Sequence, residues 1–340
     1  MNDLAIVILN WNGADLLETF LGKVVTYSAD AQIIVADNAS EDNSVAYIKA
    51  HYPTVEIVQN AQNGGFAKGY NDALKKVNSK FYLLLNSDIE VTENWLAPLY
   101  EKMQDPNVAG CQPKILSHKN KDTFEHAGAA GGFLDKNYFP FCRGRIFDHN
   151  EKDIQQYNSP IEVFWATGAA LMIRSELYHK VGGFDEDFYA HMEEIDLCWR
   201  LKRHNYSFFV VPESIVYHVG GGTLPYSSPR KSYLNFRNSL MMIIKNHEGF
   251  VLPKLVLRMS IDGIAALRFL FRGELINFWA VFKAHMYQYA KMKTLLKKRK
   301  AIQAEATTFN KTGLFGGNIV WNYYVKGVKR FSQLNQRLFK

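Results

Sequence analysis

Short apolar runs that alternate with helix-length segments constrain the fold of the first hundred residues most strongly. The runs are rich in β-branched and aromatic residues and lie at 4–9, 32–36, 55–58 and 81–85. Uninterrupted apolar runs of this length are typical of strands buried on both faces, as in a parallel sheet. Between the runs lie segments with the length and pattern of a helix, at 14–28, 44–51 and 66–77. The alternation predicts a doubly wound α/β sheet.

The pattern is more mixed after residue 107. We predict strands at 163–173 and 207–216 and a helix at 190–204, joined by Gly-rich and polar loops. From residue 229 the chain is predicted to be helical, at 231–246, 252–271 and 275–300. The expected organisation is therefore an α/β domain over 1–228, with halves at about 1–107 and 108–228, and a helical region over 229–340.

The charge of the chain is divided unevenly between these parts. Residues 231–340 carry 20 Lys and Arg against four acids, whereas residues 1–230 carry 20 against 29. A basic segment can face an anionic membrane surface, a nucleic acid or only solvent. The tail contains no recognisable nucleic-acid-binding module, so we expect no nucleic-acid partner.

The apolar stretch 252–282 is interrupted by six charged residues. It therefore lacks the run of about 18 uncharged residues that a membrane-spanning helix needs. Leu-rich and aromatic faces with interspersed Lys and Arg suit a helix that lies in the membrane interface. Packing against the α/β domain is the alternative, and the sequence leaves both open.

Features of the N-terminus and the cysteines indicate a compartment. Met1 leads almost directly into an apolar run that has no basic flank and is too short for a signal peptide. Cys111, Cys142 and Cys198 are odd in number and have no CxxC spacing. We therefore expect neither a disulfide framework nor a zinc site, and a cytoplasmic location.

Polar residues follow the predicted strands at Asn10, Asp37, Asn60 and Asn86. The carboxyl ends of strands line the ligand crevice in open parallel sheets. Asp37 could hold a base or ribose there, although capping of the next helix also explains it. Asp88 follows a buried strand, and an acid there is costly unless it is solvated, paired or metal-bound. Since Thr92 and Asn94 are better placed to cap the helix near 92–103, we interpret Asp88 as a ligand of a hard divalent cation.

Three further segments carry candidate chemistry. The glycines of 63–71 open a helix after a strand, so their backbone N–H groups and Lys68 could contact phosphate. The acids of 185–196 cannot all be ionised side by side in a cleft, so one could serve as a general base while others are structural, such as Asp196 paired with Arg200 at i,i+4. His218 ends an apolar strand before Gly220–Gly222 and is either a metal ligand, a phosphate contact or only a satisfied polar residue.

Seven stretches together resemble a known family. They are IVILNWNG (6–13), VADNASEDNS (35–44), NGGFAKGYN (63–71), LLLNSD (83–88), GAALMIRSELYHKVGGFDEDFYAHMEEIDLCWR (168–200), VPESIVYHVGGGT (211–223) and NFRNSLMMIIKN (235–246). Their content and order resemble the inverting GT-A glycosyltransferases of family 2, in particular the rhamnosyltransferase-like bacterial enzymes. The resemblance covers about residues 3–247. It implies a Rossmann-like, mostly parallel central sheet with flanking helices, with a nucleotide-sugar half at 1–107 and an acceptor half at 108–228.

The resemblance also implies roles for individual residues. The family's D-x-D motif is here Asn86-Ser87-Asp88, so Asp88 keeps the metal-ligand role, and His218 matches a metal-ligand histidine. Mg²⁺ or Mn²⁺ is the implied cofactor. The family's Glu-Asp pair is here Glu193-Glu194, which makes Glu194 the implied base, with Glu193 and Asp196 as competitors. Donor-binding residues would be Asn10, Asn12, Asp37, Asn63, Gly65, Lys68, Asn71, Asn86, Ser87 and Asp88.

The implied reaction transfers a sugar, with inversion, from a nucleotide-diphosphate donor. The acceptor would be a glycan or a polyprenyl-linked glycan in cell-surface polysaccharide synthesis, and the enzyme could lie on the cytoplasmic face of the inner membrane. Two alternatives stay open. A nucleotidyltransferase would be expected to carry a Gly-rich, basic loop after the first strand, where this chain has Trp11-Asn12-Gly13. A non-catalytic protein with the same fold is conceivable because Asn86 and Glu194 depart from the family's residues.

Overall fold

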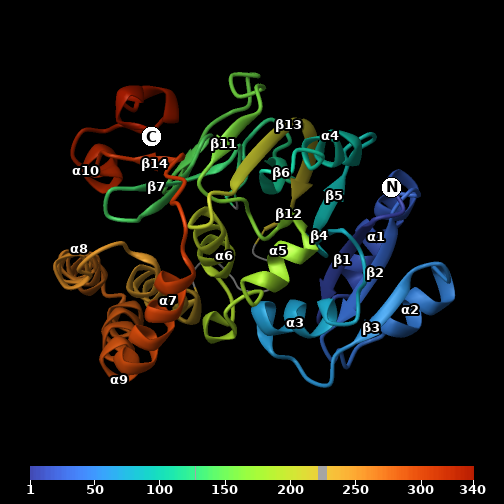
Figure 1. Cartoon of the computed structure of the whole chain (residues 1–340), viewed down its shortest axis with the longest axis horizontal. Helices are drawn as coiled ribbons and strands as arrows, with labels where there is room; N and C mark the ends of the chain where they lie inside the picture. The colour runs from blue at the N-terminus through green and yellow to red at the C-terminus, as the bar shows by residue number, and fades with distance from the viewer. Residues whose placement is uncertain (127, 221–227) are drawn as a thin grey trace.

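The computed structural model describes residues 1–126, 128–220 and 228–340. Its first part confirms the predicted alternation of strands and helices (Figure 1). The elements, in chain order, are β1 (Leu4–Asn10), α1 (Ala14–Tyr27), β2 (Gln32–Asp37), α2 (Ser44–His51), β3 (Glu56–Gln59), α3 (Gly65–Leu74) and β4 (Phe81–Asn86).

These strands form one half of a nine-stranded sheet. The order is β11-β13-β6-β12-β4-β1-β2-β3, and β5 pairs with β13 off this path. β1 runs parallel to β2 and β4, and β2 runs parallel to β3. In the other half β12 is antiparallel to both β4 and β6, so the sheet is mixed there. The added strands are β5 (Ile89–Val91), β6 (Val108–Ser117), β11 (Ile161–Val163), β12 (Ala170–Arg174) and β13 (Ser207–His218).

Helices cover both faces of the large sheet. Successive side chains of a strand point to opposite faces, and β1 accordingly contributes Leu4, Ile6 and Ile8 to one hydrophobic cluster and Ala5 and Val7 to the other. The first cluster is closed by α1, α2 and α4 (Leu96–Lys102), the second by α3, α5 (Ser175–Lys180) and α6 (Glu193–Lys202). Burial on both faces explains why the strands read as continuous apolar runs.

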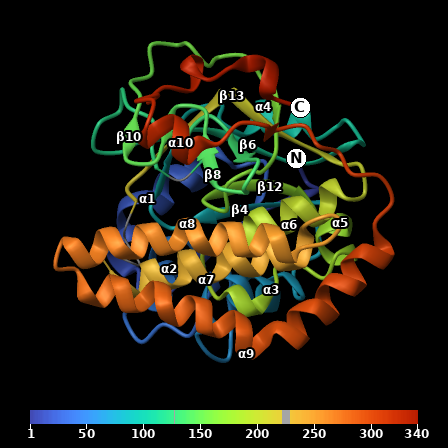
Figure 2. The ribbon, with the colours of Figure 1, turned by 90° about the vertical axis from the view of Figure 1, so that its left-hand side faces the viewer.

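A smaller sheet and a helical layer complete the molecule (Figures 1 and 2). The second sheet has the order β10-β9-β8-β7-β14 and is made of β7 (Gly132–Asp135), β8 (Pro140–Cys142), β9 (Arg145–Ile146), β10 (His149–Asn150) and β14 (Leu314–Phe315). The helical layer consists of α7 (Pro229–Asn246), α8 (Leu252–Phe271) and α9 (Leu275–Glu305), and a short α10 (Ile319–Tyr324) follows β14. The three long helices of the region 229–340 end at Glu305. The chain then returns to the α/β domain, where β14 pairs with β7.

Three predicted elements have different boundaries in the structure. The strand expected at 163–173 is two strands, because residues 164–169 leave the large sheet and Phe164 N instead donates to the Gly132 carbonyl. The helix expected at 190–204 begins only at Glu193, since the residues before it have left-handed backbone. The helix near 92–103 begins at Leu96, and neither Thr92 nor Asn94 caps it, because Thr92 Oγ1 donates to the Ile215 carbonyl.

The cysteines and the hydropathy of the helices bear on two further expectations. Cys111, Cys142 and Cys198 are buried and free in the structure. Among the described residues, no helix combines the length and the hydropathy that crossing a membrane would require.

Candidate active site

The parallel strands bring the predicted polar ends together at one edge of the sheet. Asn10 pairs in register with Asp37, and its neighbour Leu9 pairs with Asn86. Asn10 Nδ2 lies 3.2 Å from Ser40 Oγ, which also accepts a 2.9 Å bond from Asn12 N. A methyl group at Gly13 would lie 2.5 Å from Asn10 Oδ1 and 3.8 Å from Ser87 Oγ. Residues from three strand ends thus meet around Asn10.

A neighbouring amide network involves a residue that the sequence reasoning missed. Asn38 is buried, and its Nδ2 donates to Asn63 Oδ1 at 2.9 Å and to the Gly65 carbonyl at 3.2 Å. Its Oδ1 accepts from Asn60 Nδ2 at 3.1 Å. Asn38 therefore ties the end of β2 to the loop before α3, and its position next to Asp37 was the only sequence signal for it.

The N-terminus of α3 contacts protein rather than offering its N–H groups to phosphate. Phe66 N and Ala67 N both donate to the Tyr189 carbonyl, at 2.8 and 3.2 Å. Gly65 has a φ of 80°, and a methyl group on it would lie 2.6 Å from the Tyr189 ring. The expected phosphate cradle is wrong for these two N–H groups, because the loop that contains Tyr189 already satisfies them.

Lys68 and Asn71 contact this same loop. Lys68 Nζ pairs with Asp72 at 2.7 Å and with Glu186 at 3.7 Å. Asn71 Nδ2 donates to the Phe184 carbonyl at 2.9 Å, and its Oδ1 accepts from Phe184 N at 3.0 Å. Their donor-binding roles stay predictions, whereas their contacts join α3 to the loop that contains Phe184 and Glu186.

Asp88 and His218 lie side by side, as the metal-site prediction requires. β5 begins directly after Asp88 and pairs with the end of β13, which sets His218 opposite Ile89. His218 Nε2 lies 3.1 Å from Asp88 Oδ1, and Nδ1 lies 3.1 Å from Oε2 of buried Glu125. Burial would lower the pKa of His218, but hydrogen bonds with Asp88 and Glu125 outweigh it and raise the pKa to about 10. The sequence reasoning missed Glu125, which has no motif around it.

The donor set fits a hard cation only in part. Metal-bound histidines commonly direct their second ring nitrogen to a carboxylate, as His218 does toward Glu125. Within the described ranges, no group of three or more His, Cys, Asp or Glu side chains is arranged to hold a metal. Asp88 and His218 Nε2 are thus two candidate ligands, and donor oxygens or water would complete the shell. One carboxylate with diphosphate oxygens and water is common for Mg²⁺, whereas an imidazole nitrogen is not among its usual ligands. The glycines at 221–222 beside His218 lie outside the described residues.

The three candidate bases at the start of α6 have different environments. Asp196 is buried and ion-paired to Arg200 and Lys245, each at 2.8 Å. Burial would raise its pKa, but Lys245 and Arg200 outweigh that and lower it. Glu193 and Glu194 each have an Oε2 atom that is buried without a hydrogen-bond partner. Burial raises the pKa of Glu194 to about 7 and, together with the Glu194 charge, raises the pKa of Glu193 well above its ordinary value.

Glu194 and the donor-side motif lie on either side of one short segment. The Cβ atom of Glu194 lies 3.6 Å from the position that a Cβ atom on Gly168 would take. The next residue, Ala169, accepts a 2.9 Å hydrogen bond from Asn86 N. The segment that interrupts the predicted strand at 163–173 thus joins the candidate base to the Asn86-Ser87-Asp88 motif. A base with a pKa near neutrality can perform general base catalysis on a hydroxyl.

The backbone just before Glu193 is held in an unusual conformation. Tyr189, His191 and Met192 have φ values of 64°, 70° and 72°. Such residues cost about 1–3 kcal/mol each and persist where the surroundings over-determine them. Here Asn238, fully buried on α7, donates from Nδ2 to the carbonyls of Phe188, Ala190 and His191 at 2.7–2.9 Å.

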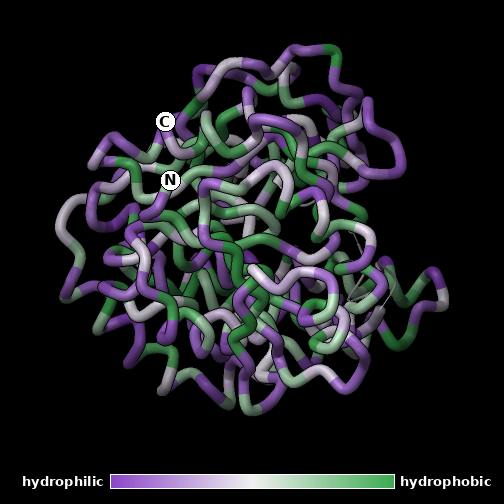
Figure 3. The backbone as a smooth tube through the Cα atoms, turned by 90° about the vertical axis from the view of Figure 1, so that its right-hand side faces the viewer, coloured by the Kyte–Doolittle hydropathy of each residue, from purple (hydrophilic) through white to green (hydrophobic). Residues whose placement is uncertain are grey.

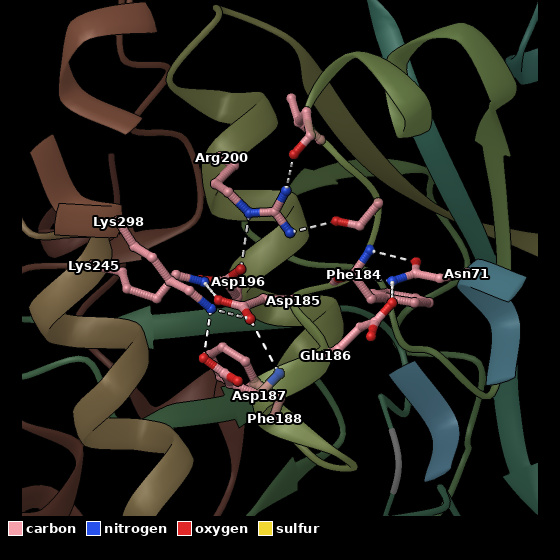
Figure 4. A network of polar contacts seen from close by, with 12 residues as sticks. Asn71, Phe184, Asp185, Glu186, Asp187, Phe188, Asp196, Arg200, Lys245 and Lys298 are labelled. Atoms are coloured by element: carbon pink, nitrogen blue, oxygen red, sulfur yellow. Dashed lines mark hydrogen bonds and ion pairs between the residues drawn. The ribbon is translucent and has the colours of Figure 1, made fainter. Parts of the chain in front are cut away.

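An ion-pair network holds α6 against the C-terminal helices (Figure 4). Lys245 of α7 bridges Asp185 and Asp196 at 2.6 and 2.8 Å. Lys298 of α9 pairs with Asp185 and Asp187, both at 2.6 Å. The C-terminal helices therefore contribute directly to the position of the candidate base.

Exchanging Asn238 for Asp is expected to lower kcat about 10- to 100-fold with little change in the donor KM. The variant keeps the volume of the side chain but turns an acceptor oxygen toward carbonyl groups, so the loop before Glu193 shifts. Asn310→Asp is the control, because Asn310 Nδ2 also donates to a carbonyl, that of Tyr206, as well as to Glu162 Oε1, and does not touch this loop. Steady-state kinetics and thermal unfolding of both variants check the prediction. Equal kcat losses in the two variants would show that Asn238 has no specific role.

The chain is similar in sequence to several known proteins. The family model described as Glycosyl transferase family 2 matches residues 5–182. The "Low-salt glycan biosynthesis hexosyltransferase Agl10" of Haloferax volcanii is 23% identical over 247 residues, which cover 71% of this chain and 75% of that protein. The "N-acetylglucosaminyl-diphospho-decaprenol L-rhamnosyltransferase" of Mycobacterium tuberculosis is 20% identical over 281 residues, or 78% of this chain and 91% of that protein.

A solved structure shows that the fold extends over nearly the whole chain. The crystal structure of GalNAc-T7 with UDP, GalNAc and Mn²⁺ superposes with a TM-score of 0.60 at 16% identity, covering 96% of this chain and 57% of that one. This likeness confirms the expected GT-A fold. The family model spans more than half of the 340 residues. The chain therefore belongs to glycosyl transferase family 2 and is a glycosyltransferase.

Proposed function

We propose that this enzyme transfers a sugar from a nucleotide-diphosphate donor to a glycan acceptor with inversion at the anomeric carbon. The observation that carries the proposal is the buried, unpaired Oε2 atom of half-buried Glu194, beside the segment that contacts Asn86 of the Asn86-Ser87-Asp88 motif. A buried carboxylate oxygen without a hydrogen-bond partner destabilises a fold. Its presence favours a catalytic protein over a non-catalytic one with the same fold. A nucleotidyltransferase is disfavoured further by Trp11-Asn12-Gly13 after β1.

In the proposed mechanism, Asp88 and His218 hold a divalent cation, Mg²⁺ or Mn²⁺. When bound, the cation supplies charge stabilisation for the departing diphosphate. Glu125 keeps the His218 ring oriented through Nδ1. In this proposal the polar side chains around Asn10 and Asp37 bind the nucleoside portion, and Asn63, Gly65, Lys68 and Asn71 contact other parts of the donor. The reported Mn²⁺ and UDP in a structure of the same fold support this assignment.

Glu194 acts as the base in this scheme. Its carboxylate accepts the proton of an acceptor hydroxyl while the hydroxyl oxygen attacks the anomeric carbon opposite the departing diphosphate. A pKa of about 7 leaves a substantial fraction ionised at neutral pH and still able to take up a proton. Asp196 is ion-paired to Arg200 and Lys245, and the pKa of Glu193 is raised by burial and by the charge of Glu194, so both are weaker candidates.

The proposed acceptor is a glycan carried on a polyprenyl diphosphate, used in cell-surface polysaccharide synthesis. Support comes from one relative whose name specifies a diphospho-decaprenol acceptor and from another named for glycan biosynthesis. Such an acceptor places the enzyme on the cytoplasmic face of a membrane as a peripheral protein. The net positive charge of residues 231–340 suits an anionic membrane surface.

A donor screen tests the proposed reaction. Purified protein is incubated with individual UDP-, GDP- and dTDP-sugars and a membrane extract or synthetic polyprenyl-diphosphate sugar, with Mg²⁺, Mn²⁺ or EDTA. We expect nucleotide diphosphate release from one donor that stops with EDTA and resumes with added metal. Release that is unaffected by EDTA would contradict the metal assignment, and absence of release with every donor would contradict the reaction.

A further inference from the structure

The helix α8 has the reverse of the usual polarity for a helix on a protein surface. Arg258 and Asp262 are buried and form a 3.0 Å ion pair, with His285 of α9 3.8 Å from Asp262. Large apolar side chains of α8 point outward instead, among them Ile264 and Phe271, which is 86% exposed. Surface helices normally bury their apolar stripe against the core. α8 therefore leaves its apolar face without a partner in the described structure.

The start of α9 extends this apolar face across the turn between the helices. Ile276 is 68% exposed and Trp279 is 52% exposed. Of the 22 large apolar side chains that are exposed in the described part of the chain, 15 lie between residues 250 and 296. Figure 2 shows α8 and α9 side by side along one side of the molecule, with the turn between them at its edge. In the opposite view of Figure 3, this end projects from the body and includes strongly hydrophobic segments.

Positive charge surrounds the same face. Exposed basic side chains on α8, the turn and α9 are Arg268, Arg272, Lys283, Lys291, Lys293, Lys297 and Lys300. The two acids between residues 250 and 300 are not exposed, because Asp262 is buried in its ion pair and Glu274 is half-buried and bonded to Asn277. The exposed charges of this face are therefore all positive.

We propose that the α8–α9 hairpin is the membrane-docking element of the enzyme, with Phe271, Ile276 and Trp279 inserted among the lipid headgroups and acyl chains of an anionic bilayer. The inference rests on the peripheral location proposed above and assigns it to a surface. Apolar and aromatic side chains flanked by Lys and Arg are what interfacial helices use. A second copy of the chain fits less well, because two such faces would place positive charges against each other.

This arrangement also gives the buried ion pair a role. Arg258 Nε donates to Asp262, and Arg258 Nη1 donates to the Tyr138 carbonyl at 3.3 Å. The polar side of α8 therefore faces the protein. α9 in turn reaches the active-site network through Lys298. The hairpin is thus fixed to the catalytic domain through its polar side, and its apolar side is left for the lipid. A docked enzyme would hold its acceptor half at a constant orientation relative to a lipid-linked acceptor.

Vesicle flotation of the full chain tests the inference. The wild type is mixed with vesicles of phosphatidylcholine alone or with 30 mol% phosphatidylglycerol, beside a Phe271→Ser/Ile276→Ser/Trp279→Ser variant. We expect the wild type to float with the anionic vesicles and the triple variant to partition at least 10-fold less. Ile154→Ser is the matched control, since Ile154 is 77% exposed on another part of the molecule and should float like the wild type.

Two further measurements separate this inference from the proposed reaction and from self-association. Transfer to a short-chain, water-soluble acceptor should be unchanged in the triple variant, so failure of the reaction and failure of docking are distinguishable. Analytical ultracentrifugation measures whether the wild type dimerises. Unchanged flotation of the triple variant would overturn the inference. A wild type that dimerises through this face and does not float with the anionic vesicles would overturn it too.

Discussion

Replacing Glu194 by Gln is expected to lower kcat by about 10²- to 10⁴-fold, with the donor KM changed little. Removal of a general base typically costs a factor of this size. Gln keeps the shape of the side chain and can occupy the same position, so binding of the donor near Asp88 should persist. Because the Glu194 Oε2 atom is buried without a hydrogen-bond partner, replacing it by an amide nitrogen breaks no hydrogen bond. Initial rates at saturating donor and acceptor measure the effect.

Glu193→Gln is the matched control for this experiment. Burial and the neighbouring Glu194 charge raise the pKa of Glu193 well above its ordinary value, which favours its protonated form. Gln resembles a protonated Glu, and we expect less than about a 10-fold loss of kcat. A large loss in the Glu193 variant with near-normal activity in the Glu194 variant would exchange the two assignments.

Replacing Asp88 by Asn is expected to reduce activity by about 10²-fold or more at a fixed Mn²⁺ concentration. The variant removes the carboxylate that lies 3.1 Å from His218 Nε2. Stabilisation of a leaving group by a metal amounts to several kcal/mol, and each 1.36 kcal/mol corresponds to a factor of ten in rate. Activity measured against Mn²⁺ concentration should show a higher half-saturating concentration, which separates weakened metal binding from a general loss of structure.

Glu90→Gln provides the corresponding control for Asp88. Glu90 is also a buried acid after β4, but its carboxylate pairs with Lys23 and, at 2.9 Å, with Lys121. We expect its half-saturating Mn²⁺ concentration to match that of the wild type. If Asp88→Asn and Glu90→Gln behaved alike, Asp88 would not be a metal ligand.

Features that depend on local pattern could be predicted from the sequence. β1, β2 and β4 are buried on both faces, so each appears as an uninterrupted apolar run, and the polar residues at their ends follow from strand direction. Parallel pairing then brings Asn10, Asp37 and Asn86 to one edge without further information. The pairing of Asp196 with Arg200 also follows from helical spacing and is confirmed.

Features that depend on distant partners could not be predicted. The Tyr189 carbonyl reaches the N-terminus of α3 from 122 residues away in the chain, which no glycine pattern around residue 65 reveals. Glu125 and Asn238 matter through single contacts to His218 and to three backbone carbonyls. α6 starts late because of left-handed residues whose conformation Asn238 stabilises. The apolar face of α8 is exposed because buried Arg258 and Asp262 occupy the opposite side. Hydropathy alone does not predict which of these two faces is buried.

The pH dependence of kcat/KM for the wild type and Glu194→Gln, from pH 5 to 8 at saturating Mn²⁺, tests the central claim most directly. A base works only when ionised, and burial raises the pKa of Glu194 to about 7. The wild-type rate should therefore rise with pH and level off above an apparent pKa near 7, whereas the residual rate of the variant should lack this limb. The same limb in Glu194→Gln, or a flat profile in the wild type, would contradict the assignment of Glu194 as the base.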